Sequence, residues 1–114
     1  MRVLTLDDEE WRQEVFARCY AKDDLIQVYT ADKAKKALLT GQFDLVCLDH
    51  DLGFGRGNGY EVAQFIAALP PAQQPKEVLV HSFNIAAAVR MVGILRDAGI
   101  ETYMQPFDYK WGNK

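Results

Sequence analysis

A short apolar run in the middle of the chain ends in side chains that can do chemistry. The run at 45–48 is typical of a strand buried on both faces of a parallel sheet, and Asp49, His50 and Asp51 follow it at once. The loop 53–59 comes next and has glycine at every second position. Because ligands bind outside the carboxyl ends of the strands in open α/β sheets, this pattern predicts a site here.

A second acidic pair follows another expected strand. Asp7 and Asp8 come directly after the apolar run 2–6, and neighbouring parallel strands would bring them close to Asp49 and Asp51. Carboxylates that lie together repel one another unless a cation sits among them, and oxygen ligands of this kind suit Mg²⁺. A nearby imidazole also makes Mn²⁺ a candidate. The alternative is that Asp7 and Asp8 only cap the next helix.

A histidine and two capping residues follow the fourth expected strand, 78–80. His81 is a candidate general acid–base or phosphoryl ligand, with a purely structural role as the alternative. Ser82 and Asn84 can cap the helix expected at 85–98, and the same helix N-terminus offers hydrogen-bond donors to a phosphate.

Arg56 lies in the glycine-rich loop and is a candidate for binding a phosphate through its planar guanidinium. The loop matches neither a P-loop nor a dinucleotide-binding fingerprint, since no Gly-Lys-Ser/Thr follows it. A loop without function is the alternative.

The spacing of apolar and capping residues predicts alternating strands and helices. Strands are expected at 2–6, 25–29, 45–48, 78–80 and 100–104, and helices from the acidic run to about 20, then at 31–39, 60–69 and 85–98. This alternation predicts one doubly wound α/β domain over residues 1–114, a flavodoxin-like five-stranded parallel sheet in the order 2-1-3-4-5. The remainder, 108–114, is too short for a full packing helix, so we expect the last helix to be truncated or missing.

Composition limits the class of protein. The 114 residues are 49% hydrophobic and 25% charged, with a net charge of −3, which argues against nonspecific binding to long nucleic acid. The sequence contains no apolar run long enough to span a bilayer, and its acidic start is unlike a signal peptide. We therefore expect a cytoplasmic protein that does not interact with membranes.

Several of these motifs together resemble response-regulator receiver domains. The matching segments are Leu6-Asp7-Asp8-Glu9, Phe43-Asp44-Leu45-Val46-Cys47-Leu48-Asp49, Gly59-Tyr60-Glu61, Ser82 and Gln105-Pro106-Phe107. The resemblance implies that Asp7 and Asp8 form the acidic pair, that Asp49 accepts a phosphoryl group, and that Ser82 is the switch hydroxyl. It also implies that Asp51 stands where receivers offer a backbone carbonyl to Mg²⁺.

Three features depart from the receiver pattern. Gln105 stands where receivers have a lysine, the loop after Asp49 is longer and lacks the usual proline, and the last helix is largely absent. The segments Leu48-Asp49-His50-Asp51-Leu52-Gly53 and His81-Ser82-Phe83-Asn84 are similar instead to the cyclic-phosphate-processing receiver domains. This resemblance implies roles for Asp8, Asp49, Asp51 and His81 in acting on cyclic phosphates of nucleotides or RNA ends.

Three functions follow as hypotheses. The first is a metal-dependent phosphoesterase that binds a phosphorylated small molecule or nucleic-acid end, with Asp49, Asp51 and His81 as catalytic residues. In it Asp8 and Asp49, together with Asp51, hold the cation, His81 protonates the leaving oxygen, and Arg56 steadies the substrate. The second is a stand-alone receiver that is phosphorylated on Asp49 and signals to a separate partner. The third is a non-catalytic module that binds another protein or a second copy of itself, where Phe107, Tyr109 and Trp111 would cover an open apolar face or join a dimer.

Overall fold

Five parallel strands form the sheet, in the order β2-β1-β3-β4-β5. The computed structural model describes residues 1–107, and its strands are β1 (Arg2–Leu6), β2 (Asp24–Val28), β3 (Leu45–Leu48), β4 (Glu77–Val80) and β5 (Glu101–Met104). Because every pairing is parallel, the chain must cross over the sheet between successive strands. The predicted flavodoxin-like fold and strand order are confirmed.

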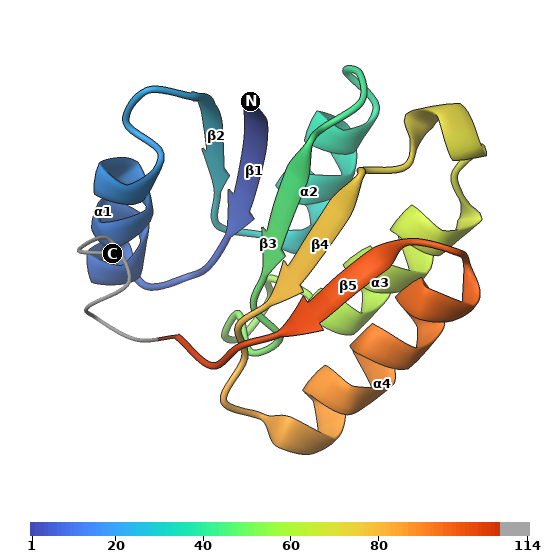
Figure 1. Cartoon of the computed structure of the whole chain (residues 1–114). Helices are drawn as coiled ribbons and strands as arrows, with labels where there is room; N and C mark the ends of the chain where they lie inside the picture. The colour runs from blue at the N-terminus through green and yellow to red at the C-terminus, as the bar shows by residue number, and fades with distance from the viewer. Residues whose placement is uncertain (108–114) are drawn as a thin grey trace.

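Four α-helices cover the two faces of the sheet unequally in the described part of the chain. They are α1 (Glu10–Cys19), α2 (Ala31–Leu38), α3 (Gly59–Ala68) and α4 (Ile85–Asp97). Figure 1 shows α1 on one face and the other three helices on the opposite face. The larger core lies under these three helices, and a smaller core lies under α1. None of the helices described for residues 1–107 is long and apolar enough to cross a membrane.

Side-chain caps begin three helices close to where the sequence predicts them. Thr30 Oγ1 accepts a hydrogen bond from the first turn of α2, and Asn84 Oδ1 does the same for α4. At α3, Asn58 and Glu61 form a reciprocal capping box, which satisfies two backbone donors that the helix leaves unpaired. These caps matter for function because α3 and α4 both begin beside the strand ends.

The expected element boundaries differ from the observed ones by about one residue. The largest addition is a short 3₁₀-helix, η1 (Pro71–Gln73), inside the stretch expected to be a loop. Pro71 occupies its first position, where the fixed φ of proline is already suitable and its missing N–H costs nothing.

Phe107 covers part of the sheet face on which α1 lies. Its buried ring packs edge-on against Trp11 and Phe16, with ring centroids 5.3 and 5.5 Å apart. The sequence predicts a covering role for Tyr109 and Trp111 as well, but these residues, like the predicted truncation of the last helix, lie outside the described residues.

Candidate functional site

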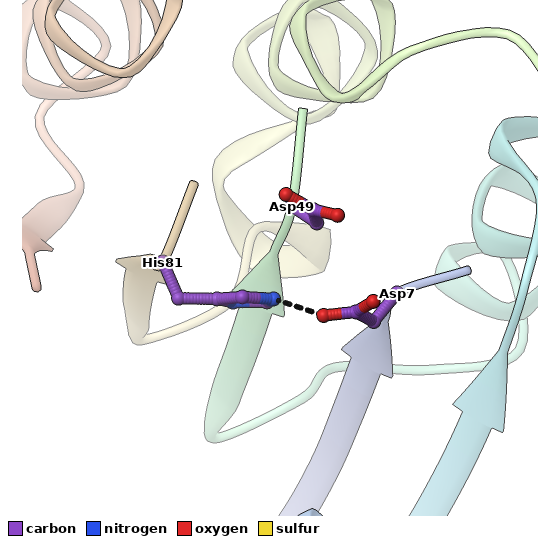
Figure 2. Close-up of side chains that lie close together, drawn as sticks. All are labelled: Asp7, Asp49 and His81. Atoms are coloured by element: carbon purple, nitrogen blue, oxygen red, sulfur yellow. Dashed lines mark hydrogen bonds and ion pairs between the residues drawn. The ribbon is translucent and has the colours of Figure 1, made fainter. Parts of the chain in front are cut away.

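The register of the sheet places three polar side chains in one row. The last residues of β1, β3 and β4 pair with one another, so the residues that follow them, Asp7, Asp49 and His81, are level. Side chains alternate between the faces of a strand, and the last strand residues belong to the larger core. These three side chains therefore project toward the α1 face. Figure 2 shows His81 and Asp7 pointing at each other, with Asp49 close to them.

Asp7 is held from several directions. Its carboxylate is fully buried; Oδ2 lies 3.0 Å from His81 Nε2, and Oδ1 accepts a 2.9 Å hydrogen bond from the Glu9 amide. Its carbonyl oxygen accepts a hydrogen bond from Gln13 Nε2 at 3.1 Å. The orientation of this carboxylate is thus set by β4 and by the start of α1.

Asp49 is the carboxylate of the row that opens to solvent. Only 3% of the residue is exposed, and its Oδ1 accepts a 2.9 Å hydrogen bond from the His50 amide. Burial, followed by the charge of Asp7, raises the pKa of Asp49 to about 7. A carboxyl group that titrates near neutrality is characteristic of functional sites.

His81 sits in a closed aromatic environment. It is completely buried, with its ring against Phe16 (centroids 5.1 Å apart) and Phe107 (6.2 Å). Burial lowers the pKa of His81, and the bond to Asp7 offsets part of that effect. A neutral imidazole that contacts Asp7 is the form this environment favours.

Arg12, in the first turn of α1, supplies the positive charge. Its Nη1 lies 3.5 Å from Asp7 Oδ2 and 3.5 Å from Asp49 Oδ2. One guanidinium therefore serves two buried carboxylates, and neither contact has the short, two-pronged geometry of a strong arginine–carboxylate pair.

A cavity of about 370 Å³ opens beside Asp49. It is lined by Asp8, Glu9, Arg12, Asp49, Asp51, Gly53 and Phe83. Phe83 is 58% exposed at its edge. The cavity connects Asp49 of the acidic row with solvent.

The predicted carboxylates divide into two groups. Among the described residues, a group of three has potential metal-ligand atoms that all lie within 4.8 Å of one another: Asp7, Asp49 and His81. Asp8 and Asp51 line the cavity but do not belong to that group. Asp51 instead lies 2.6 Å from His50 Nδ1 through its Oδ1.

Ser82 and Asn84 are both tied to the start of α4. Ser82 is buried, and its Oγ accepts a 3.0 Å hydrogen bond from the Asn84 amide. Asn84 caps the helix at the amide of Ala87 and also donates to Asp51 Oδ1 at 3.5 Å. The structure thus shows capping for Asn84, while phosphate binding by either residue stays a prediction.

Arg56 and Gln105 are not among the residues that line the cavity. Arg56 is exposed in the glycine-rich loop, where its carbonyl accepts a 2.9 Å hydrogen bond from the Ala31 amide. Gln105 follows β5, and its amide donates to the Val80 carbonyl at 2.9 Å. The phosphate-binding role predicted for Arg56 stays a prediction.

The sequence-based prediction missed Arg12, although a signal for it exists. A cation in the first turn of a helix is unfavourable because it faces the positive end of the helix dipole. Such a local conflict is expected at functional sites. Arg12 is also close in sequence to the acidic pair Asp7 and Asp8, and the two signals together could have identified it as a site residue.

Gln13 was missed as well and holds α1 against the strand ends. It is buried; its Nε2 donates to the carbonyls of Asp7 and Val28, and its Oε1 accepts from Thr5 Oγ1 at 2.7 Å. These bonds fix where the first turn of α1 begins, and with it the position of Arg12.

The residues present fit a hard divalent cation. Two buried carboxylates share one distant guanidinium, and burial together with their mutual repulsion raises the pKa of Asp49. Carboxylate oxygens of this kind are the preferred ligands of Mg²⁺, and the imidazole 3.0 Å from Asp7 is compatible with Mn²⁺.

The comparison with protein families identifies the chain. Residues 2–97 match the cyclic-phosphate processing receiver domain. The chain belongs to this family. No curated protein matches its sequence.

Solved receiver structures are similar to this receiver domain over nearly its whole length. The non-phosphorylated HemR receiver domain from Leptospira biflexa has a TM-score of 0.72 and 25% identity, covering 96% of this chain and 85% of that one. A CheY-like receiver domain from Methylobacillus flagellatus has a TM-score of 0.69 and 19% identity, covering 96% and 89%. A response regulator from Burkholderia pseudomallei, solved with a phosphorylated aspartic acid, a calcium ion and citrate, has a TM-score of 0.68 and 26% identity, covering 96% and 62%.

Proposed function

We propose that this receiver domain binds a divalent cation, Mg²⁺ or Mn²⁺, between Asp7 and Asp49 and hydrolyses a cyclic phosphate on a nucleotide or an RNA end. The observation that carries the proposal is the buried row of Asp7, Asp49 and His81 beside a cavity of about 370 Å³. The description of the family supports the substrate class.

The residues of the chain have distinct roles in this proposal. Asp7 and Asp49 would hold the cation, and Asp8 would add a carboxylate from the cavity wall. When bound, a divalent cation neutralises a phosphate and makes water more acidic. Asp51, exposed at the edge of the cavity, accepts the proton of the attacking water.

Hydrolysis breaks one bond of the phosphate ring. The water oxygen bonds to phosphorus, one ester oxygen leaves with a proton, and the product is a phosphomonoester. The sequence predicts His81 as the donor of that proton, and in that role its ring, which is buried and neutral here and does not line the cavity, would have to be charged and exposed to the cavity. Because its Nε2 faces Asp7, a second role for His81 is to hold the Asp7 carboxylate in position.

Phosphorus NMR of a 2′,3′-cyclic nucleotide, with protein and Mg²⁺ or Mn²⁺, tests the proposal. We expect ring opening with the natural protein and none with Asp49→Asn. Asp97→Asn is a matched control, since it removes one carboxylate from an exposed position at the end of α4. Turnover that survives Asp49→Asn, or no turnover with any cation, would contradict the proposal.

Phosphorylation of Asp49 is the second candidate function. Asp49 lines the cavity at the end of β3, and the similar regulator from Burkholderia pseudomallei carries a phosphorylated aspartic acid. Intact mass spectrometry after incubation with acetyl phosphate and Mg²⁺ distinguishes the two candidates. A mass increase of one phosphoryl group that Asp49→Asn abolishes supports phosphorylation of Asp49.

Protein binding without catalysis is the third candidate. Val89 on α4 and Met104 on β5 are exposed beside a shallow hollow that Arg96 also lines. Light scattering during size-exclusion chromatography tests whether this surface pairs two copies of the chain. A monomer at all concentrations would contradict the homodimer.

A further inference from the structure

We propose that Arg12 is the anion-binding residue of this site and that it exchanges partners, releasing Asp7 and Asp49 when a divalent cation binds and then holding the phosphate. This inference rests on the proposed function and adds a residue that the sequence motifs do not identify.

The contacts of Arg12 are those of a loosely held counter-ion. Nη1 makes both hydrogen bonds to the carboxylates, each 3.5 Å long. The buried Nε has no hydrogen-bond partner within residues 1–107. A guanidinium offers five N–H donors in a planar fork, so once the side chain turns from the carboxylates toward the cavity, its donors can bind a phosphate.

The charges around the cavity make the exchange favourable. A divalent cation at Asp7 and Asp49 would lie close to the guanidinium, and like charges repel. Arg12 is the one basic residue among the described residues that line the cavity. A phosphate in the cavity is the partner that would offset both positive charges.

Aromatic rings give Arg12 a support that is independent of the carboxylates. Its Cζ lies 5.4 Å from the ring centroid of Trp11, 5.5 Å from that of Phe83 and 5.8 Å from that of Phe107. A guanidinium within about 6 Å of an aromatic ring is attracted to its face. These rings can keep the side chain at the cavity when the carboxylates bind another cation.

The test uses two probes, for which the exchange predicts effects of opposite sign. Mg²⁺ binding is measured by calorimetry without phosphate, and inorganic phosphate binding by phosphorus NMR with Mg²⁺ in excess. In Arg12→Gln, we expect Mg²⁺ to bind at least threefold more tightly, because a competing cation is gone. We expect phosphate to bind at least tenfold more weakly, because its ligand is gone.

Two further variants make the result specific. Arg12→Lys keeps the charge, so Mg²⁺ affinity should stay within about twofold of the natural value, while phosphate binding is partly retained. Arg18→Gln makes the same change of charge at an exposed position in the last turn of α1, and both affinities should be unchanged.

The possible failures are distinguishable. If Arg12→Gln weakens Mg²⁺ binding as well, or leaves phosphate binding intact, the exchange is wrong while the proposed function stands. If the natural protein binds neither Mg²⁺ nor phosphate, the proposed function and this inference both fall.

Discussion

At the scale of single residues, the environment of Asp49 opposes the charge of its carboxylate. It is buried next to Asp7, and its pKa is raised to about 7. The folded protein therefore binds a proton here more tightly than the unfolded chain does. In the absence of a cation, Asp49 destabilises the fold as it ionises.

Asp49→Asn should stabilise the cation-free protein at high pH. At about pH 4 Asp49 is protonated in the folded natural protein and about half protonated in the unfolded chain, so the variant should differ little. At about pH 8 the carboxylate is charged, and we expect the variant to be more stable by roughly 1–3 kcal/mol. Urea unfolding in the presence of a chelator measures both values.

The stability of the natural protein must be compared with that of Asp49→Asn at each pH, because the titration of His81 also changes stability with pH, in the opposite direction. Its pKa is lowered by burial, so its contribution to stability is lost as the pH falls below that of an unfolded histidine, about 6.5. Both proteins contain His81, so its contribution cancels in the difference between their free energies of unfolding. A difference that does not grow from about pH 4 to 8 would contradict the raised pKa of Asp49.

His81→Asn separates the two roles considered for this histidine. If His81 mainly protonates the leaving oxygen, hydrolysis should fall about 100-fold or more with Mg²⁺ affinity unchanged. If it mainly orients Asp7, to which its Nε2 is bonded at 3.0 Å, Mg²⁺ affinity should fall about 10-fold or more. Calorimetry and phosphorus NMR on the same variant distinguish these outcomes.

At the scale of elements, the start of α3 packs directly against the end of β3. Gly59 begins this helix, and its amide donates to the His50 carbonyl at 3.0 Å. A Cβ at this position would collide with the Asp49 carbonyl oxygen and lie 2.8 Å from Met91 Cε. The absence of a side chain at Gly59 is what lets the helix approach the site.

Gly59→Ala should therefore damage both the fold and the site. We expect a loss of roughly 1–3 kcal/mol in stability, typical of forcing extra atoms into a packed region, together with weaker Mg²⁺ binding because Asp49 must move. Gly93→Ala is the matched control in α4, because nothing lies within 4 Å of the added Cβ. It should be neutral or stabilising by up to about 1 kcal/mol, and unfolding curves for the two variants test the contrast.

At the scale of the whole molecule, the acidic row lies at the carboxyl edge of the sheet and joins three strands. Asp7, Asp49 and His81 follow β1, β3 and β4. A cation that binds these groups connects parts of the chain that lie far apart in the sequence. Since such a site exists only in the folded protein, binding must stabilise the fold.

Mg²⁺ or Mn²⁺ should raise the melting temperature. At about 100 times the dissociation constant the gain is about 2.7 kcal/mol, which corresponds to roughly 10 °C for a domain of this size. Calorimetric melting with and without the cation measures the shift. Asp49→Asn should melt at nearly the same temperature in both conditions, and an equal shift in the two proteins would place the cation elsewhere.

The sequence by itself determined the fold and the edge of the sheet that carries the acidic groups. Alternating apolar runs and capping residues are local signals, and parallel strands bring their carboxyl ends to one edge. This reasoning predicted the strand order and gathered Asp7, Asp8, Asp49 and Asp51 at one edge, with His81 and Ser82 on the same edge. The structure brings Asp7, Asp49 and His81 of these within 4.8 Å of one another. The functional roles of these residues stay predictions.

Only the tertiary structure decided which groups meet in space. The ends of β1, β3 and β4 are level, and this register places His81 beside Asp7. The hydrogen bonds of Gln13 fix the start of α1, from which Arg12 reaches both carboxylates. Register and helix placement depend on contacts between distant segments, which periodicity along one chain cannot specify. For that reason the sequence pointed to Arg56 as the arginine of the site, whereas the fold places Arg12 at the cavity.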